Sequence, residues 1–226
     1  MTKNKNNQAI WSTRIKKKTS GIFLKVGSSI DVDKKLYKED IRGSIAHVEM
    51  LFRQKIISFQ IKNKIIYGLK KIEKEISKNK FEFDTKYEDI HMNIEKRLFK
   101  IIGDEAGYMH TARSRNDQVI TDFKIWIKSA TKEIDSNLIK IIKTTLKIAE
   151  KNIETVMPGL THLKNAQPVS LGHYLMAYVE MFSRDKKRFN NNLESLNENP
   201  LGVSALSGTS FNIDRNYTTK KLGFKK

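Results

Sequence analysis

The sequence predicts an all-α protein. Its 226 residues include only three Pro and eleven Gly, so few positions interrupt a long helix. Apolar residues recur at three- and four-residue intervals over most of the chain. The clearest pattern is an isoleucine at every seventh position: Ile120, Ile127, Ile134, Ile141 and Ile148. This spacing predicts one helix roughly 50 Å long, whose apolar strip belongs in an extended bundle or an oligomer.

Composition narrows the class of protein. Forty-three basic residues against 25 acidic ones give a net charge of +18, which can indicate nucleic-acid binding. The lysines, however, are spread along every segment and form no cluster with interleaved aromatic residues, so we expect no nucleic-acid partner. Without cysteine there is no disulfide, thiolate metal ligand or cysteine nucleophile. Residues 1–7 are polar with no apolar segment after them, and no apolar run is long enough for a membrane span. We therefore expect a cytoplasmic protein with no membrane partner.

Three shorter helices are predicted before the long one, over residues 33–57, 62–78 and 87–102, with Asp33 as the N-cap of the first. Residues 1–32 look irregular. His47 lies among apolar neighbours and is interpreted as structural. Asp89 and His91 stand at the start of the third helix, where they could face a site or simply serve as polar cap residues.

Two polar stretches are candidates for a functional site. The first, residues 108–119, reads Y-M-H-T-A-R-S-R-N-D-Q-V and leads onto the start of the long helix. Free backbone N–H groups, the helix dipole and the guanidinium groups of Arg113 and Arg115 suit a carboxylate-rich ligand there. The alternative is a solvated basic turn with a helix cap. The second stretch, T-H-L-K-N-A-Q-P at 161–168, follows a break at M-P-G and precedes another helix, near whose start His173 is structural or capping.

These stretches resemble a known family. M-H-T-A-R-S-R-N-D-Q-V at 109–119 and M-P-G-L-T-H-L-K-N-A-Q-P-V at 157–169 resemble two signature regions of argininosuccinate lyase. That enzyme belongs to the fumarase/aspartase superfamily of all-helical homotetramers. Supporting matches are D-I-R-G-S-I-A-H at 40–47, E-D-I-H at 88–91, P-L-G at 200–202 and L-G-F at 222–224. The stretch W-S-T-R at 11–14 departs from the family, which usually has glycines there.

The resemblance covers the whole chain but only about the first half of a typical member. It implies an N-terminal helical domain over residues 1–107 and the first part of a central helical bundle over 108–226. A third family signature, a Gly-Ser-Ser-rich loop that ends in M-P-x-K-x-N-P and carries a catalytic serine, has no match. We therefore expect a truncated chain that is inactive alone.

The resemblance also implies a reaction, the elimination of arginine from argininosuccinate to leave fumarate, with no metal or cofactor. His162 resembles the catalytic histidine, and four residues resemble substrate-binding positions: Ser29, Arg115, Asn116 and Thr161. Five more resemble residues near the site: Asp33, Asp89, His91, Arg113 and Gln167. Each active site of the superfamily is assembled from three subunits, and this chain would supply two of the three signature regions.

Two other functions are consistent with parts of the sequence. A non-catalytic interaction protein on a lyase scaffold would use the exposed apolar strips as its association surface, but it would not need the intact polar signatures. An adenylosuccinate lyase-like activity keeps the fold and changes the substrate; the R-S-R-N-D-Q stretch counts against it.

Overall fold

The computed structural model describes residues 21–226 and is predominantly helical, as the sequence predicts. The stretch at residues 11–14 lies outside the described residues. Contacts divide the chain into two compact units, one of residues up to 123 together with 199–226, the other of residues 124–198. The domain boundary after residue 107 stays a prediction, because this grouping reflects contacts within one copy of the chain.

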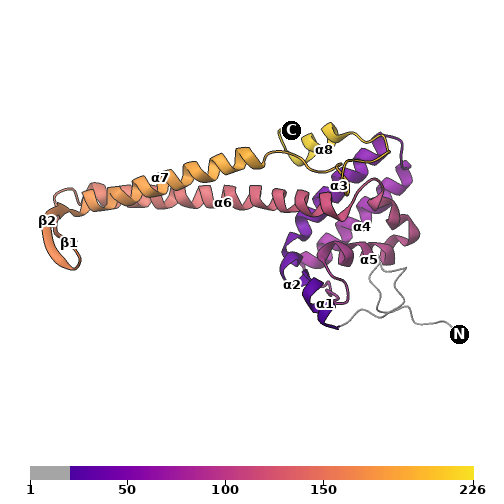
Figure 1. Cartoon of the computed structure of the whole chain (residues 1–226), viewed down its shortest axis with the longest axis horizontal. Helices are drawn as coiled ribbons and strands as arrows, with labels where there is room; N and C mark the ends of the chain where they lie inside the picture. Colours follow the sequence, from indigo (N-terminus) through magenta and orange to yellow (C-terminus); the bar gives the residue numbers. More distant parts are fainter. Residues whose placement is uncertain (1–20) are drawn as a thin grey trace. The chain divides into compact units, whose positions relative to one another are not determined.

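The first unit is built around three packed helices (Figure 1): α3 (Tyr37–Arg53), α4 (Phe59–Ser77) and α5 (Ile90–Ile102). Short helical elements lead into and out of them: α1 (Gly21–Gly27), α2 (Ile30–Asp33), the 3₁₀ helix η1 (Lys34–Leu36) and the 3₁₀ helix η2 (Gly103–His110). The predicted apolar faces form the core, with Val48, Leu51, Ile65, Leu69, Ile72, Ile90, Ile94 and Leu98 fully buried. Burial of these faces drives the packing of the three helices.

Asp33 stands at the N-cap position of η1, as predicted, but its side chain does not act as a cap. Asp33 ends α2, and its side chain makes no cap hydrogen bond to the helical turn that follows. The backbone is already helical there, so the N–H groups after it have other acceptors. Asp33 Oδ1 instead accepts from the N–H of Ile90, at 3.1 Å, while Asp89 Oδ1 caps α5 by accepting from the N–H of Met92.

The long helix predicted from the isoleucine repeat is confirmed as α6 (Arg115–Lys151), 37 residues long. It begins a few residues earlier than the repeat indicates, inside the first polar stretch. Its start is a reciprocal cap: the Ser114 N–H donates to Asp117 Oδ1 at 3.0 Å, and the Asn116 N–H donates to Ser114 Oγ at 3.3 Å. Because Ser114 and Asp117 form these cap hydrogen bonds, the polar stretch is a helix start as well as a candidate site.

The second unit contains the later part of α6, an antiparallel hairpin and α7 (Leu171–Leu196). The hairpin, β1 (Val156–Thr161) and β2 (Lys164–Ser170), was not predicted. Pro158 and Pro168 exclude a helix here, and Gly159 lets the strands approach, since a Cβ on it would lie 2.4 Å from the Gln167 carbonyl oxygen. This hairpin is the one sheet among residues 21–226.

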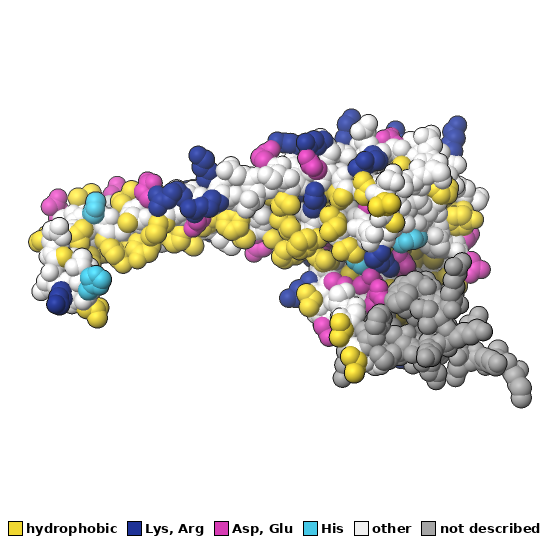
Figure 2. Space-filling model, viewed as in Figure 1, with side chains coloured by type: hydrophobic (Ala, Val, Ile, Leu, Met, Phe, Trp, Pro, Cys, Tyr) yellow, Lys and Arg dark blue, Asp and Glu magenta, His cyan; other side chains and the backbone are white. Residues whose placement is uncertain are grey.

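The α6/α7 pair of the second unit buries little of its apolar surface. The two helices run antiparallel (Figure 1), joined by polar contacts such as Lys186 Nζ with Asp135 Oδ1 at 3.3 Å. In the isoleucine repeat, Ile134, Ile141 and Ile148 are 37, 44 and 46 % exposed. Figure 2 shows hydrophobic side chains along this pair of helices. In one copy of the described chain, the isoleucine strip predicted to pack in a bundle is therefore not covered.

The hairpin turn carries backbone strain. His162 (φ 49°) and Leu163 (φ 64°) are both in the left-handed region, which a two-residue type I′ turn requires and which glycine adopts most readily. Leu163 is 94 % exposed, so packing does not compensate for the strain. We expect Leu163→Gly to raise the free energy of unfolding by up to about 1 kcal/mol.

Chemical denaturation of the two proteins checks this value. Leu160→Gly, in β1 of the same hairpin but without a positive φ, is the matched control and should lose stability instead. A loss of stability in Leu163→Gly as large as in the control would contradict the prediction.

The chain after α7 returns to the first unit. There α8 (Arg215–Leu222) packs on α3, with Arg42 Nη2 donating to the Leu222 carbonyl at 3.0 Å and the Tyr217 hydroxyl donating to Glu49 at 2.9 Å. This helix was not predicted. Across residues 21–226, none of the helices combines the length and hydropathy that a membrane span needs.

Candidate active site

Seven of the predicted site residues lie in the first unit, at the two ends of α2, the start of α5 and the segment that leads into and begins α6. The loop before α2 is hydrogen-bonded to the segment just before α5: the Ser29 N–H donates to the Glu88 carbonyl at 2.7 Å. Ser29 Oγ donates to Asp33 Oδ2 at 2.6 Å. Ser29 remains exposed and Asp33 half-buried. Burial raises the pKa of Asp33, with the hydrogen bond from Ser29 acting in the opposite direction. This loop thus presents a hydroxyl and a carboxylate at one position.

Arg115 is the cation at the centre of this group. Its Nε lies 3.0 Å from Asp89 Oδ2 and its Nη1 lies 3.1 Å from Glu95 Oε1. Nη1 also donates to Gln118 Oε1 at 2.7 Å. Burial opposes the charge of Arg115, but Glu95 and Asp89 outweigh it and raise its pKa. With 27 % of its side chain exposed, Arg115 is a fixed guanidinium that a ligand can still reach.

Asp89 has two contacts: its Oδ1 caps α5, and its Oδ2 lies beside Arg115. Glu95 was missed by the sequence reasoning. It lies one helical turn after His91 on α5, so helical spacing was the available signal. Burial opposes ionisation of Glu95, but the hydrogen bond with His110 and the charge of Arg115 prevail and lower its pKa. Glu95 is therefore a second carboxylate that pairs with Arg115.

His91 does not face solvent beside Ser29. It is 1 % exposed, and its Nδ1 lies 2.9 Å from Asp40 Oδ1 and 3.5 Å from Asp122 Oδ2. Asp40 Oδ1 also accepts from Gln118 Nε2 at 2.5 Å. Burial works against ionisation of Asp40, but His91 and Arg113 hold its pKa well below its usual range. Burial and the charge of Asp40 raise the pKa of Asp122 well above its usual range. His91 thus belongs to a buried polar network with Asp40 and Asp122, which Gln118 connects to Arg115.

Arg113 lies in the same interior. It is buried, and its Nη1 donates to Ser44 Oγ at 3.0 Å. The arginine predicted as a second ligand fork is therefore beneath the surface, where it supplies positive charge to Asp40. Gly43 makes room for this network, because a Cβ there would lie 2.8 Å from Asp122 Oδ1.

Asp40, His91 and Asp122 have the donor types of a metal site, and one ligand atom of each lies within 4.8 Å of the others. Two observations favour a structural network. Asp40 Oδ1 already accepts two hydrogen bonds, and the buried Arg113 balances the charge of Asp40. A divalent cation would add positive charge to a set that is already compensated.

His47 confirms its structural interpretation and makes the fold sensitive to acid. It is fully buried, and because a carbonyl only accepts, its Nε2 carries a proton and donates to the Thr111 oxygen at 2.8 Å. Burial and the nearby Arg113 lower the pKa of His47 to about 3. The unfolded chain binds a proton at His47 below pH ~6.5 and the folded chain does not. Stability from this group is therefore present above pH ~6.5 and is lost as the pH falls towards 3.

We expect this group to remove up to about 1.4 kcal/mol of unfolding free energy per pH unit below pH ~6.5. Denaturant titrations at several pH values measure the slope. In His47→Gln, where an amide keeps a donor for Thr111, the slope should become shallower by that amount. His173→Gln, at an exposed histidine, should keep the original slope. Equal slopes for His47→Gln and the unsubstituted protein would contradict the assignment.

The other three predicted site residues, Thr161, His162 and Gln167, lie on the hairpin of the second unit. All three side chains are exposed. His162 stands in the strained turn and Thr161 pairs with Lys164 across it. The hairpin therefore presents a hydroxyl and an imidazole at its tip. His173, at the start of α7, is exposed too; only its N–H takes part in the cap, donating to Ser170 Oγ.

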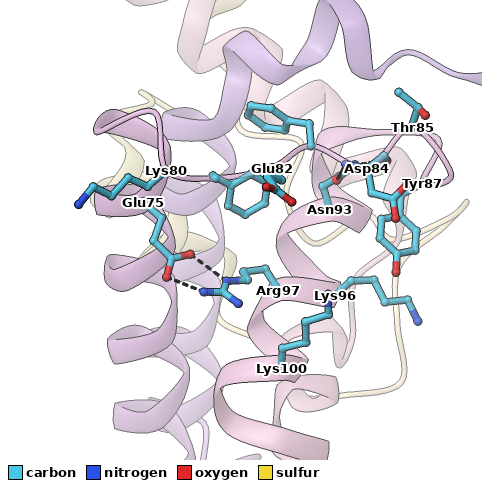
Figure 3. Close-up of a pocket in the computed structure, with 12 residues that line it drawn as sticks. Glu75, Lys80, Glu82, Asp84, Thr85, Tyr87, Asn93, Lys96, Arg97 and Lys100 are labelled. Carbon is cyan, nitrogen blue, oxygen red and sulfur yellow. Dashed lines mark hydrogen bonds and ion pairs between the residues drawn. The ribbon is translucent and has the colours of Figure 1, made fainter.

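A pocket of about 440 Å³ also opens in the first unit, between the end of α4, residues 80–87 and α5. Figure 3 shows Glu75 and Arg97 paired at one side of it. The predicted site residues do not line this pocket. It is therefore separate from the cluster around Arg115.

Comparison with known proteins identifies the class. Residues 13–226 match the sequence model of a family described as Lyase, and the chain belongs to this lyase family. The chain is 79 % identical over 226 residues to argininosuccinate lyase of Pelagibacter ubique, a match that covers 100 % of this chain and 49 % of that protein. It is 51 % identical over 225 residues to argininosuccinate lyase of Chelativorans sp., covering 48 % of it. The resemblance drawn from the two signature stretches is thereby confirmed.

Solved structures agree with the fold. A variant of EDDS lyase with bound fumarate has a TM-score of 0.76 and 28 % identity, covering 89 % of this chain and 39 % of that one. β-Carboxy-cis,cis-muconate cycloisomerase from Acinetobacter calcoaceticus has a TM-score of 0.66 at 19 % identity, covering 90 % and 50 %, and shows likeness of fold alone. This chain spans about half the length of the curated relatives it matches.

Proposed function

We propose that this chain takes part in argininosuccinate lyase activity, the cleavage of argininosuccinate to arginine and fumarate. The observation that carries the proposal is the setting of Arg115, a reachable guanidinium fixed by Asp89 and Glu95 at the start of α6. An arginine held this way offers planar donors to a carboxylate. The 79 % identical relative supports the reaction, and the similar EDDS lyase variant binds fumarate, which is the proposed product.

The chemistry assigns roles to the predicted residues. A base removes a proton from the carbon next to a carboxylate, the C–H electrons form the double bond, and the carbon–nitrogen bond breaks. The leaving guanidinium nitrogen receives a proton. The negative charge that develops on the carboxylate must be held by fixed donors, the role proposed for Arg115. We assign substrate contacts to Asn116, Ser29 and Thr161, and acid–base or orienting work to His162.

The proposal includes a homotetramer with active sites shared between subunits, in the cytoplasm. The exposed strip of Ile134, Ile141 and Ile148 supports association of copies through α6. The exposed tip residues Thr161 and His162 are also available to another copy. Sedimentation of the chain with and without Ile141→Lys tests this: a charge in the strip should shift the protein towards monomer. An unchanged oligomeric state would count against the strip as the interface.

To test this function, the chain is joined to the second half that its relatives possess. This chain is continued with the second half of the Pelagibacter ubique protein, and fumarate release from argininosuccinate is followed. We expect turnover by the joined protein and none by the 226-residue chain alone. Adenylosuccinate is the control substrate and should not be cleaved.

The exposed apolar strip also favours a second function, a non-catalytic interaction protein. That function predicts a joined protein that assembles but neither binds nor cleaves argininosuccinate.

For the lyase function, robust turnover by the 226-residue chain alone would overturn the proposal that the site needs regions outside this chain.

A further inference from the structure

Asp117 is the residue that follows Arg115 and Asn116 on the first turn of α6. Asp117 is 1 % exposed. Its buried carboxylate accepts three hydrogen bonds, all from backbone N–H groups. Oδ1 accepts from Ser114 at 3.0 Å, and Oδ2 accepts from Gly202 at 2.9 Å and from Ser204 at 2.8 Å. One carboxylate therefore caps the helix and holds a segment more than eighty residues later in the chain.

The held segment has an unusual backbone. Gly202 has φ 104° and Ser204 has φ 56°, both in the left-handed region. Gly202 has no room for a side chain, because a Cβ would lie 2.9 Å from atoms of Ile213 and Arg215. Arg215 Nη2 donates to the Asn199 carbonyl, just before this turn, at 3.1 Å. Hydrogen bonds from Gly202 and Ser204 to Asp117 and from Arg215 to Asn199 thus hold this part of the chain.

The last residue of this turn, Ala205, contacts the predicted substrate-binding residue Asn116. The Ala205 carbonyl accepts from Asn116 Nδ2 at 3.1 Å. Since a carbonyl only accepts, this contact determines which end of the Asn116 amide is nitrogen. Asn116 is otherwise an exposed side chain, so its orientation depends on where the turn places Ala205.

We propose that Asp117 is a positioning residue for Asn116 of the substrate-binding pair. It holds the turn at Gly202 and Ser204 so that Ala205 orients the Asn116 amide. Only a carboxylate suits the position, because it accepts on both oxygens, whereas an amide would direct its N–H groups at one or two of the three donors. The inference rests on the proposed lyase function.

The test is Asp117→Asn in the joined protein. We expect KM for argininosuccinate to rise at least tenfold while kcat falls less than threefold. The control is Asp214→Asn, since Asp214 also accepts a backbone N–H in the first unit, from Tyr217 at 3.0 Å, as the cap of α8. Its KM should be unchanged. A tenfold rise in both variants would assign the effect to general loss of structure and overturn the proposal.

A double-mutant cycle separates positioning from stability. If Asp117 acts through Asn116, then Asp117→Asn should change KM less than threefold in an Asn116→Ala background. A purely structural role predicts the same tenfold rise in either background, and that result would overturn the proposal.

Amide hydrogen exchange on the 226-residue chain keeps the inference testable if the joined variant does not fold. Asp117→Asn should speed exchange at Gly202 and Ser204 at least tenfold and leave α4 unaffected. Unchanged exchange at both amides would overturn the proposal, even with an active joined protein. An inactive unsubstituted joined protein with accelerated exchange would instead overturn the lyase function, and with it the substrate-positioning role.

Discussion

Asp40→Ala is expected to lower the free energy of unfolding by about 3–5 kcal/mol, the largest effect of any single substitution considered for this chain. Asp40 is fully buried and accepts from His91 and Gln118, and its charge balances the buried Arg113. Alanine removes the carboxylate to which His91 and Gln118 donate at 2.9 and 2.5 Å, and with it a negative charge that stabilises the buried guanidinium. Because domains are stable by about 5–15 kcal/mol, the loss removes a large part of the total.

Equilibrium denaturation in guanidinium chloride measures the loss on the 226-residue chain. Asp104→Ala, at an exposed carboxylate in η2, is the control and should change stability by no more than about 0.5 kcal/mol. A loss below about 1 kcal/mol for Asp40→Ala would show that the buried network does not hold the helices together.

Arg115→Lys is expected to lower kcat/KM of the joined protein by about 100-fold. Lysine keeps the positive charge but cannot contact Asp89, Glu95 and a substrate carboxylate together, because its single ammonium group lacks the planar fork. Loss of a fixed donor to a developing charge weakens transition-state binding more than folding.

The matched control is Arg97→Lys. Arg97 also makes a two-pronged contact with a carboxylate, that of Glu75, at 2.8 and 2.7 Å, but it lines the pocket of Figure 3. Its substitution should leave kcat/KM within twofold. Near-equal rates for Arg115→Lys and the unsubstituted protein would exclude Arg115 from the proposed reaction.

The helices with a continuous apolar face were predictable, since burial of that face determines them. The helix α8 was not, because its sequence R-N-Y-T-T-K-K-L has no apolar stripe and depends on the Asp214 cap and on packing against α3. The hairpin escaped prediction for a related reason: its strands are largely exposed and lack alternating polarity. Elements stabilised by tertiary contacts leave little trace in local periodicity.

The site residues also fall into those that local sequence reveals and those that only packing brings together. Arg115 and Asn116 stood out because a polar run at a helix start is conspicuous. Asp40 and Glu95 did not, because single carboxylates within amphipathic helices look like solvated positions until a neighbouring helix brings a cation to them. The burial of Arg113 depends in the same way on α3, which supplies Ser44. Charge pairing between distant segments is a property of packing and cannot be read from spacing alone.

The uncovered isoleucines of α6 also have a thermodynamic consequence. Whatever associates with that strip binds the folded helix and not the unfolded chain, so mass action couples folding to assembly. Under the proposed association of copies through α6, the melting temperature of the α6/α7 pair is a function of protein concentration, and dilution destabilises it. Melting curves recorded at several protein concentrations then report on assembly as well as on folding.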